Sequence, residues 1–156
     1  MSEGRQPTIR NREAFHHYEI LETFEAGIVL AGTEVKSIRE GKANLRDAYA
    51  TIKDGEVWLV NAFVSPYTHG NRLNHEERRT RKLLLNRAEI AKLTGRTVEK
   101  GLTLVATKMY FKNGRVKVEI GIGRGKKLHD KRETSMRRTI DRETQVVLKE
   151  RETGRR

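Results

Sequence analysis

The strongest constraint on the fold is a pair of strand-like segments, residues 103–111 and 115–123, on either side of Asn113-Gly114. This dipeptide suits the positive φ angles of a two-residue hairpin turn. In the second segment every second residue is apolar, namely Val116, Val118, Ile120 and Ile122. The period of two predicts a strand with one face toward a core and the other toward solvent or a ligand.

Shorter strand signals precede this hairpin. Asp54-Gly55 predicts a second tight hairpin, between residues 49–53 and 56–63. Residues 18–30 predict the first strand, with a bend or bulge at Gly27.

Three short helices are also predicted. They follow the N-capping candidates Asn11, Thr33 and Asn86, and the last two are expected to end at Gly41 and Gly95. About six strands and three helices in roughly 123 residues favour a mainly β fold, and a closed antiparallel OB-type barrel fits the hairpin spacing. Periodicity alone does not separate this barrel from other small barrels.

The C-terminal segment, residues 124–156, has a different composition. It contains 12 Lys or Arg against six acidic residues, so it holds about half of the net charge of +12. With no aromatic residue and six large aliphatic ones it cannot build a core that offsets the entropy of ordering. We therefore expect three regions: a disordered start (1–10), a barrel (11–123) and a basic tail (124–156) that is disordered when free.

The tail has a second property, visible when it is drawn as a helix. At about 100° per residue, Met136, Ile140 and Val147 form a narrow apolar stripe. Basic residues form a stripe on the opposite side, namely Lys131, Arg138, Arg142, Lys149 and Arg156. A tail that becomes helical on an anionic partner fits this pattern, and a solvated charged tail with accidental periodicity is the alternative.

The excess positive charge favours RNA as the partner. Candidate phosphate contacts are Lys36 with Arg39, one helical turn apart, and the basic cluster 78–82, which includes Arg81 and Lys82. A general rRNA-binding ribosomal protein and a nuclease are the rival classes, although the carboxylates show no paired metal-binding motif.

Other classes of function receive little support. The chain has no cysteine, and its five histidines include no H-x-x-x-H pair, so neither a metal site nor a cofactor is predicted. The N-terminus lacks the apolar centre of a signal peptide, and no apolar run approaches 18 residues. We expect a soluble, cytoplasmic protein that is not bound to a membrane.

Several long motifs resemble the small protein B family, the SsrA-binding proteins. In chain order they are residues 11–14 (NREA), 25–39 (EAGIVLAGTEVKSIR), 41–45 (GKANL), 79–86 (RTRKLLLN) and 125–132 (GKKLHDKR). The resemblance implies an OB-type barrel with flanking helices and no catalytic activity. It also implies binding to transfer-messenger RNA (SsrA RNA) and its delivery to stalled bacterial ribosomes for trans-translation, with GTP-bound elongation factor Tu as an indirect partner.

The resemblance also assigns residues. Glu25, Leu84, Asn86 and Lys117 match RNA-contacting positions of the family. His129, Asp130, Lys131 and Arg132 match the start of the tail that meets the ribosomal decoding centre. Lys126 and Lys127 precede them in the same motif and are further candidate ribosome contacts. Further along, Val147 and Leu148 match a distal aliphatic pair that the family needs for tagging. The resemblance implies that the tail occupies the empty message channel as a helix, where the stripe residues Arg138, Ile140 and Arg142 are further candidate contacts. Many relatives carry tryptophan where this chain has Ile140.

Overall fold

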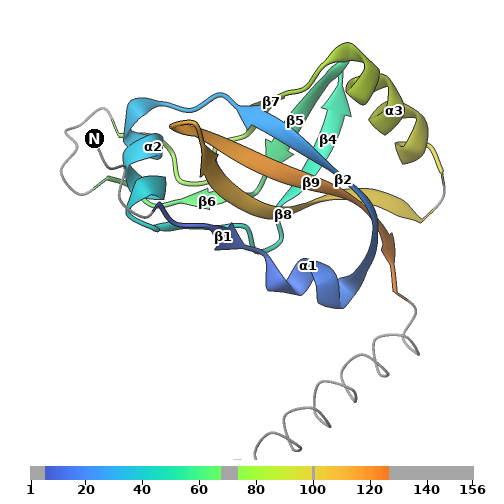
Figure 1. Cartoon of the computed structure of the whole chain (residues 1–156), viewed down its shortest axis with the longest axis horizontal. Coiled ribbons are helices and arrows are strands. Elements are labelled where there is room, and N and C mark those ends of the chain that lie inside the picture. The colour runs from blue at the N-terminus through green and yellow to red at the C-terminus, as the bar shows by residue number, and fades with distance from the viewer. Residues whose placement is uncertain (1–5, 68–73, 100, 127–156) are drawn as a thin grey trace, which may run out of the picture. The chain divides into compact units, whose positions relative to one another are not determined.

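The structure, a computed structural model, describes residues 6–67, 74–99 and 101–126. Twelve elements follow one another in the described chain (Figure 1). They are β1 (Ile9–Arg10), α1 (Arg12–His17), β2 (Tyr18–Ile28), α2 (Gly32–Arg39), β3 (Ala43–Asn44), β4 (Tyr49–Lys53), β5 (Glu56–Val60), β6 (Phe63–Val64), β7 (Arg81–Leu84), α3 (Arg87–Thr97), β8 (Leu102–Lys112) and β9 (Arg115–Gly125).

Six strands form a closed ring, in the order β8-β4-β5-β7-β2-β9, and β9 pairs back onto β8. Every pairing in the ring is antiparallel. β1 adds to β8, while β3 and β6 form a separate pair. The prediction of a mainly β, six-stranded antiparallel barrel with three short helices is therefore confirmed.

Both predicted hairpin turns are present. Asp54 and Gly55 have φ angles of 54° and 74°, and Asn113 and Gly114 have φ angles of 53° and 75°. The strands that they join begin to pair directly beside each turn, with Lys53 opposite Glu56 and Lys112 opposite Arg115. The two positive φ values in each turn match the twist of the flanking strands, so each turn sets the register of its hairpin.

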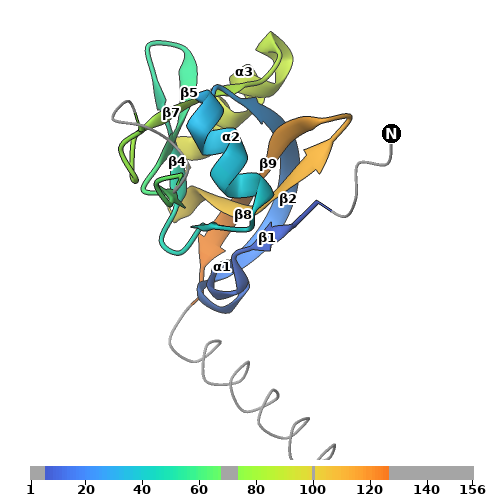
Figure 2. The ribbon, with the colours of Figure 1, turned by 90° about the vertical axis from the view of Figure 1, so that its left-hand side faces the viewer.

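The core fills the inside of the ring. Alternate residues of β5, β8 and β9 point into it, among them Val57, Leu59, Leu104, Val118 and Ile120, all nearly or fully buried. Two helices contribute one fully buried aliphatic side chain each, Ile38 from α2 and Leu93 from α3. Seen along the barrel, α2 lies across one end of it (Figure 2). On β5 and β7 the residues between the buried ones are half-buried or exposed, so these strands present side chains on their outer face.

Asn11 precedes α1 but does not act as the predicted capping side chain. Its side-chain amide is buried and donates to the carbonyl oxygens of Leu45 and Ala106, both at 2.9 Å. Its backbone N–H donates to Thr107, where the pairing of β8 with β9 shifts register. Asn11 therefore supplies hydrogen bonds to β8 at its irregular point, between the residues of β8 that pair with β4 and those that pair with β1.

Four local predictions are corrected. Ile9 and Arg10, expected to be disordered, form β1 because Ile9 is buried against the core. The irregularity of β2 lies between Ile20 and Glu22 and not at Gly27. The remaining two concern helices: the Thr33 hydroxyl bonds His75 instead of capping α2, and α3 runs past Gly95 to Thr97.

A buried ion pair connects α2 to the strands. Glu34 and Arg81 are both fully buried, and Arg81 Nε donates to Glu34 Oε2 at 2.6 Å. The guanidinium also donates to the carbonyl oxygens of Ala62, Glu76 and Glu77. Arg79 donates to the same carboxylate at 2.7 Å and to Val29. The pair thus joins the end of β2, helix α2, the segment before β6 and the start of β7.

Replacement of Asn11 should measure the value of the buried amide. Asn11→Ala leaves two buried carbonyl groups without their donor, which should lower the free energy of unfolding by about 2 to 3 kcal/mol. Urea denaturation checks this value. The matched control is Asn44→Ala, because the exposed Asn44 amide accepts only a local bond from Arg46 and its loss should cost about 0.5 kcal/mol or less. Equal effects of the two substitutions would contradict the assigned role.

The Glu34–Arg81 pair should produce a pH-dependent stability. Burial pulls the pKa of Glu34 upward, but hydrogen bonds from Arg79, the Ala31 N–H and Arg81 outweigh it and leave the pKa below its ordinary value near 4.5. A carboxylate whose pKa is lowered in the folded state contributes its full stabilisation above the unfolded-state pKa. That contribution is lost as the pH falls through the folded-state pKa.

The measurement compares the wild-type chain with Glu34→Gln in urea between pH 7 and pH 3. At pH 7 the variant should be less stable by about 3 kcal/mol, because the Arg81 charge stays buried without its partner. The difference in free energy of unfolding between the two proteins should become smaller as the pH drops below about 4.5, because Glu34 of the wild-type chain then becomes protonated. The other carboxylates are the same in both proteins, so their titration cancels in this difference. A gap that is constant with pH would contradict the assignment.

Candidate RNA interface

The short strand β7 divides its side chains between the core and the surface. Arg81 and Leu83 are buried, while Lys82 and Leu84 point outward, as the two-residue period of a strand requires. Leu84 is 51% exposed, unusual for a large aliphatic residue, and it lies opposite Gly27 of β2. Lys82 lies opposite Trp58 of β5, and its ammonium is 2.9 Å from Glu56.

Gly27 lets Leu84 lie close to β2. A Cβ at Gly27 would sit 3.3 Å from Leu84 Cβ, tighter than most contacts of real side chains. On its other side Gly27 pairs with Lys117 of β9. Leu84, Gly27 and Lys117 therefore form one row across three neighbouring strands, and Tyr110 of β8 continues it, opposite Lys117. Residues more than 80 positions apart meet on one outward face.

Glu25 lies two residues before Gly27 on the same face. Its carboxylate accepts a 2.6 Å hydrogen bond from the Tyr110 hydroxyl and lies 3.1 Å from the Lys112 ammonium. The hydrogen bond from Tyr110, followed by that from Lys112, lowers the pKa of Glu25. Burial and the bond to Glu25 raise the pKa of Tyr110. Glu25 is thus held as a carboxylate, which suits the N–H groups of a nucleobase rather than a phosphate.

Asn86 stands just beyond Leu84, at the start of α3. Its Oδ1 accepts from the Glu89 N–H at 2.8 Å, and Glu89 Oε1 accepts from the Asn86 N–H at 3.2 Å. This capping box, predicted from the sequence, fixes the orientation of the exposed amide. Because Oδ1 is used by the helix, the group that the exposed side chain can offer to a ligand is its Nδ2 donor.

Lys36 and Arg39 lie exposed on α2, on a different part of the surface. The Lys36 ammonium is 5.5 Å from the Tyr67 ring centre, and the Arg39 guanidinium is 5.8 Å from that of Phe111. Since Phe111 separates Tyr110 from Lys112 in β8, the end of α2 adjoins the hairpin that supports Glu25. Both cations are exposed, so both stay candidates for phosphate contacts.

Arg81 is a correction to the predicted phosphate contacts. Its side chain has no exposed surface and is bonded to Glu34 and three carbonyl groups, so it does not reach a phosphate. It faces inward because it occupies the same face of β7 as Leu83. Its neighbour Lys82 is partly exposed and remains a candidate.

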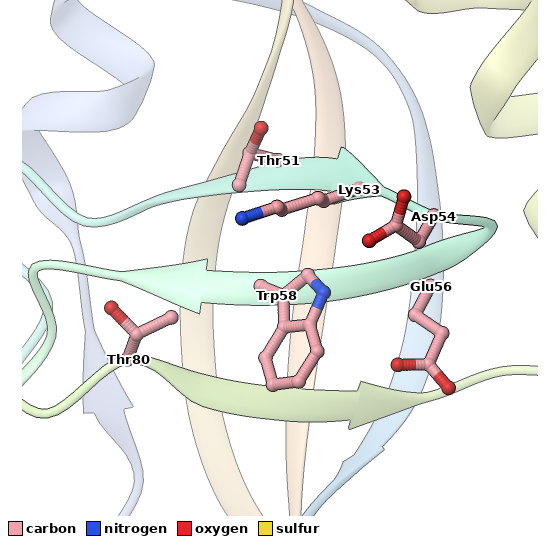
Figure 3. A pocket seen from close by; sticks show the side chains of 6 residues that line it. All are labelled: Thr51, Lys53, Asp54, Glu56, Trp58 and Thr80. Atoms are coloured by element: carbon pink, nitrogen blue, oxygen red, sulfur yellow. The ribbon is translucent and has the colours of Figure 1, made fainter.

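Sequence reasoning missed Tyr110 and Lys112. Residues 103–112 show no regular alternation of polar and apolar residues, and nothing in the sequence indicated that Glu25 would lie within reach of Tyr110 and Lys112. It also missed a surface pocket of about 370 Å³ beside Trp58 (Figure 3). The pocket lies on the outside of β4 and β5, next to Lys82.

Most of the predicted ribosome contacts fall outside the described residues. Only Lys126 lies at the described end, and the rest are Lys127, His129, Asp130, Lys131, Arg132, Arg138, Ile140, Arg142, Val147 and Leu148. Among the described residues, no three of the His, Asp and Glu side chains are grouped closely enough to hold a metal ion. None of the described helices is long and apolar enough to cross a membrane.

Comparison with known proteins identifies the family. The sequence model of the SmpB protein family matches residues 8–150. An SsrA-binding protein of Trichormus variabilis is 60% identical over 149 residues, 95% of this chain and 96% of the relative. An SsrA-binding protein of Carboxydothermus hydrogenoformans is 55% identical over 141 residues, 90% of this chain and 95% of the relative.

A solved structure agrees with this result. It is described as "tmRNA-SmpB: a journey to the center of the bacterial ribosome", with a TM-score of 0.67 and 50% identity, covering 78% of this chain and 86% of the other. Sequence and fold thus lead to the same conclusion: the chain belongs to the SmpB protein family.

Proposed function

We propose that this protein binds transfer-messenger RNA through the outer face of its barrel and delivers it to stalled bacterial ribosomes for trans-translation. The observation that carries the proposal is the meeting of Glu25, Leu84 and Lys117 on one exposed face, at positions that match RNA contacts of the family. The relatives that are 55–60% identical to this chain are named SsrA-binding proteins, which supports SsrA RNA as the ligand.

Each candidate residue, on the outer face of the strands or on the adjoining helix α2, has a chemical role in the proposal. Lys117, Lys82, Lys36 and Arg39 neutralise phosphates, and Leu84 offers an apolar surface to a base or ribose. Glu25 and Asn86 accept from and donate to base edges. The protein acts by binding, without catalysing a reaction, as a monomer in the cytoplasm.

The basic tail has a separate role in the proposal. Residues 124–156, including Lys126 to Arg132, contact the decoding centre and the empty message channel of the small subunit. There the tail folds as a helix with its basic stripe toward rRNA. GTP-bound elongation factor Tu takes part indirectly, through the charged RNA.

Immunoprecipitation followed by sequencing of the bound RNA tests the proposal against its rivals. Strong enrichment of transfer-messenger RNA is the expected outcome. Enrichment of rRNA alone would favour a general ribosomal protein, and RNA cleaved at defined sites would favour a nuclease.

Salt dependence should identify the phosphate contacts. The logarithm of the affinity for the tRNA-like domain should fall linearly with the logarithm of salt concentration, because bound cations release counterions. Lys36→Ala, Arg39→Ala and Lys117→Ala should each reduce the slope by about 0.7 to 0.9. Arg46→Ala serves as the comparison, because Arg46 is an exposed cation that pairs with Glu13 and belongs to none of the proposed contacts. Unchanged slopes in all three variants would refute the assigned contacts.

A truncated chain should separate the two roles. Removal of residues 126–156 keeps every strand and the whole described core, so the barrel should fold and bind the tRNA-like domain. Affinity should be lower, since about five net positive charges are lost. Peptide tagging on stalled ribosomes, measured in a reconstituted system, should be abolished. Normal tagging by the truncated protein would show that the tail is dispensable.

A further inference from the structure

The pocket beside Trp58 has the composition of a site for a flat, partly polar group. Its volume is about 370 Å³, and it is lined by Thr51, Lys53, Asp54, Glu56, Trp58 and Thr80. Figure 3 shows the indole ring at the centre, with Thr80 toward one end and the carboxylates of Asp54 and Glu56 toward the other. An open aromatic surface, one ammonium and two carboxylates therefore surround one hollow.

The strand register holds Trp58 in this position. Trp58 lies opposite Thr51 of β4 and Lys82 of β7, and its neighbours Val57 and Leu59 are buried in the core. Trp58 therefore faces outward. Its Nε1 is buried and has no hydrogen-bond partner among the described residues. The orientation of the ring is therefore not explained by a hydrogen bond of the indole.

The pocket continues the proposed RNA-binding face. Lys82 lies between them: it faces the same side of β7 as the exposed Leu84 and bonds Glu56, which lines the pocket. A strand of RNA that passes over Leu84 can therefore reach Trp58 without turning around an edge of the ring.

We propose that this pocket binds one unpaired nucleobase of the RNA held by the outer face. The base stacks on the Trp58 indole, as bases do on aromatic side chains in single-strand sites. Lys53 and Lys82 attract the flanking phosphates, and the Asp54 and Glu56 carboxylates accept from base N–H groups. This inference extends the proposed function by adding a second contact region on β4 and β5.

The first experiment uses the intrinsic fluorescence of the protein. Trp58 is the only tryptophan of the chain, so its emission reports on this pocket alone. Titration with a hexamer of adenosine nucleotides should quench the emission in a saturable way. An abasic hexamer with the same number of phosphates is the control, and it should leave the emission unchanged. Equal responses to the two oligomers, or no response to either, would overturn the pocket as a base site.

The second experiment measures affinity for the tRNA-like domain of SsrA RNA. Loss of one stacked base should weaken binding about tenfold in Trp58→Leu, and Trp58→Phe, which keeps a ring, should recover most of it. Thermal unfolding of both variants shows whether the barrel remains intact. Weakening of equal size in both folded variants, or in neither, would overturn the inference.

A third variant keeps the two proposals distinguishable. Lys117→Ala should weaken binding whether or not the pocket takes part. Weakening by Lys117→Ala together with full binding by Trp58→Leu would overturn the pocket and leave the proposed function standing. If the unsubstituted protein fails to bind SsrA RNA, the proposed function is wrong, and the oligomer titration decides on the pocket alone.

Discussion

The ion pair between Glu34 and Arg81 is the constraint on which the arrangement of the surface depends. Burial of two charges costs several kcal/mol each, and only a full set of partners offsets that cost. Arg81 has such a set, since Glu34 and the carbonyl groups of Ala62, Glu76 and Glu77 accept from it. The pair therefore tolerates only one arrangement of α2 against β7. Lys36 and Arg39 on α2, and Leu84 on β7, acquire their positions from it.

The planar guanidinium is suited to this role because it donates in several fixed directions at once. A lysine at position 81 would offer one compact charge and would leave some of these carbonyl groups unpaired. The next residue of β7, Lys82, faces outward. Of these two neighbouring basic residues, Arg81 is therefore part of the core and Lys82 is part of the surface. The motif from Arg79 to Asn86 thus combines a structural half and a binding half in consecutive residues.

The sequence predicted best what depends on neighbouring residues. The hairpins at Asp54-Gly55 and Asn113-Gly114, the capping box of Asn86 and the alternation of β9 are local, and all are present. Arg81 was misassigned because a basic residue in a charged cluster is normally exposed, and its partner Glu34 is 47 positions away. Asn11 was misassigned for the same reason: its hydrogen-bond acceptors are 34 and 95 positions away.

Ring closure decides how this protein can recognise RNA. Since each of the six strands pairs with a neighbour on both sides, the ring has no edge strand, and we assign recognition to outward side chains. Those side chains come from adjacent strands in rows: Lys117, Gly27 and Leu84 form one, and Lys82, Trp58 and Thr51 form another. β7 belongs to both rows. A surface built in this way can follow a curved RNA backbone across several strands, with small residues such as Gly27 providing the space for larger neighbours.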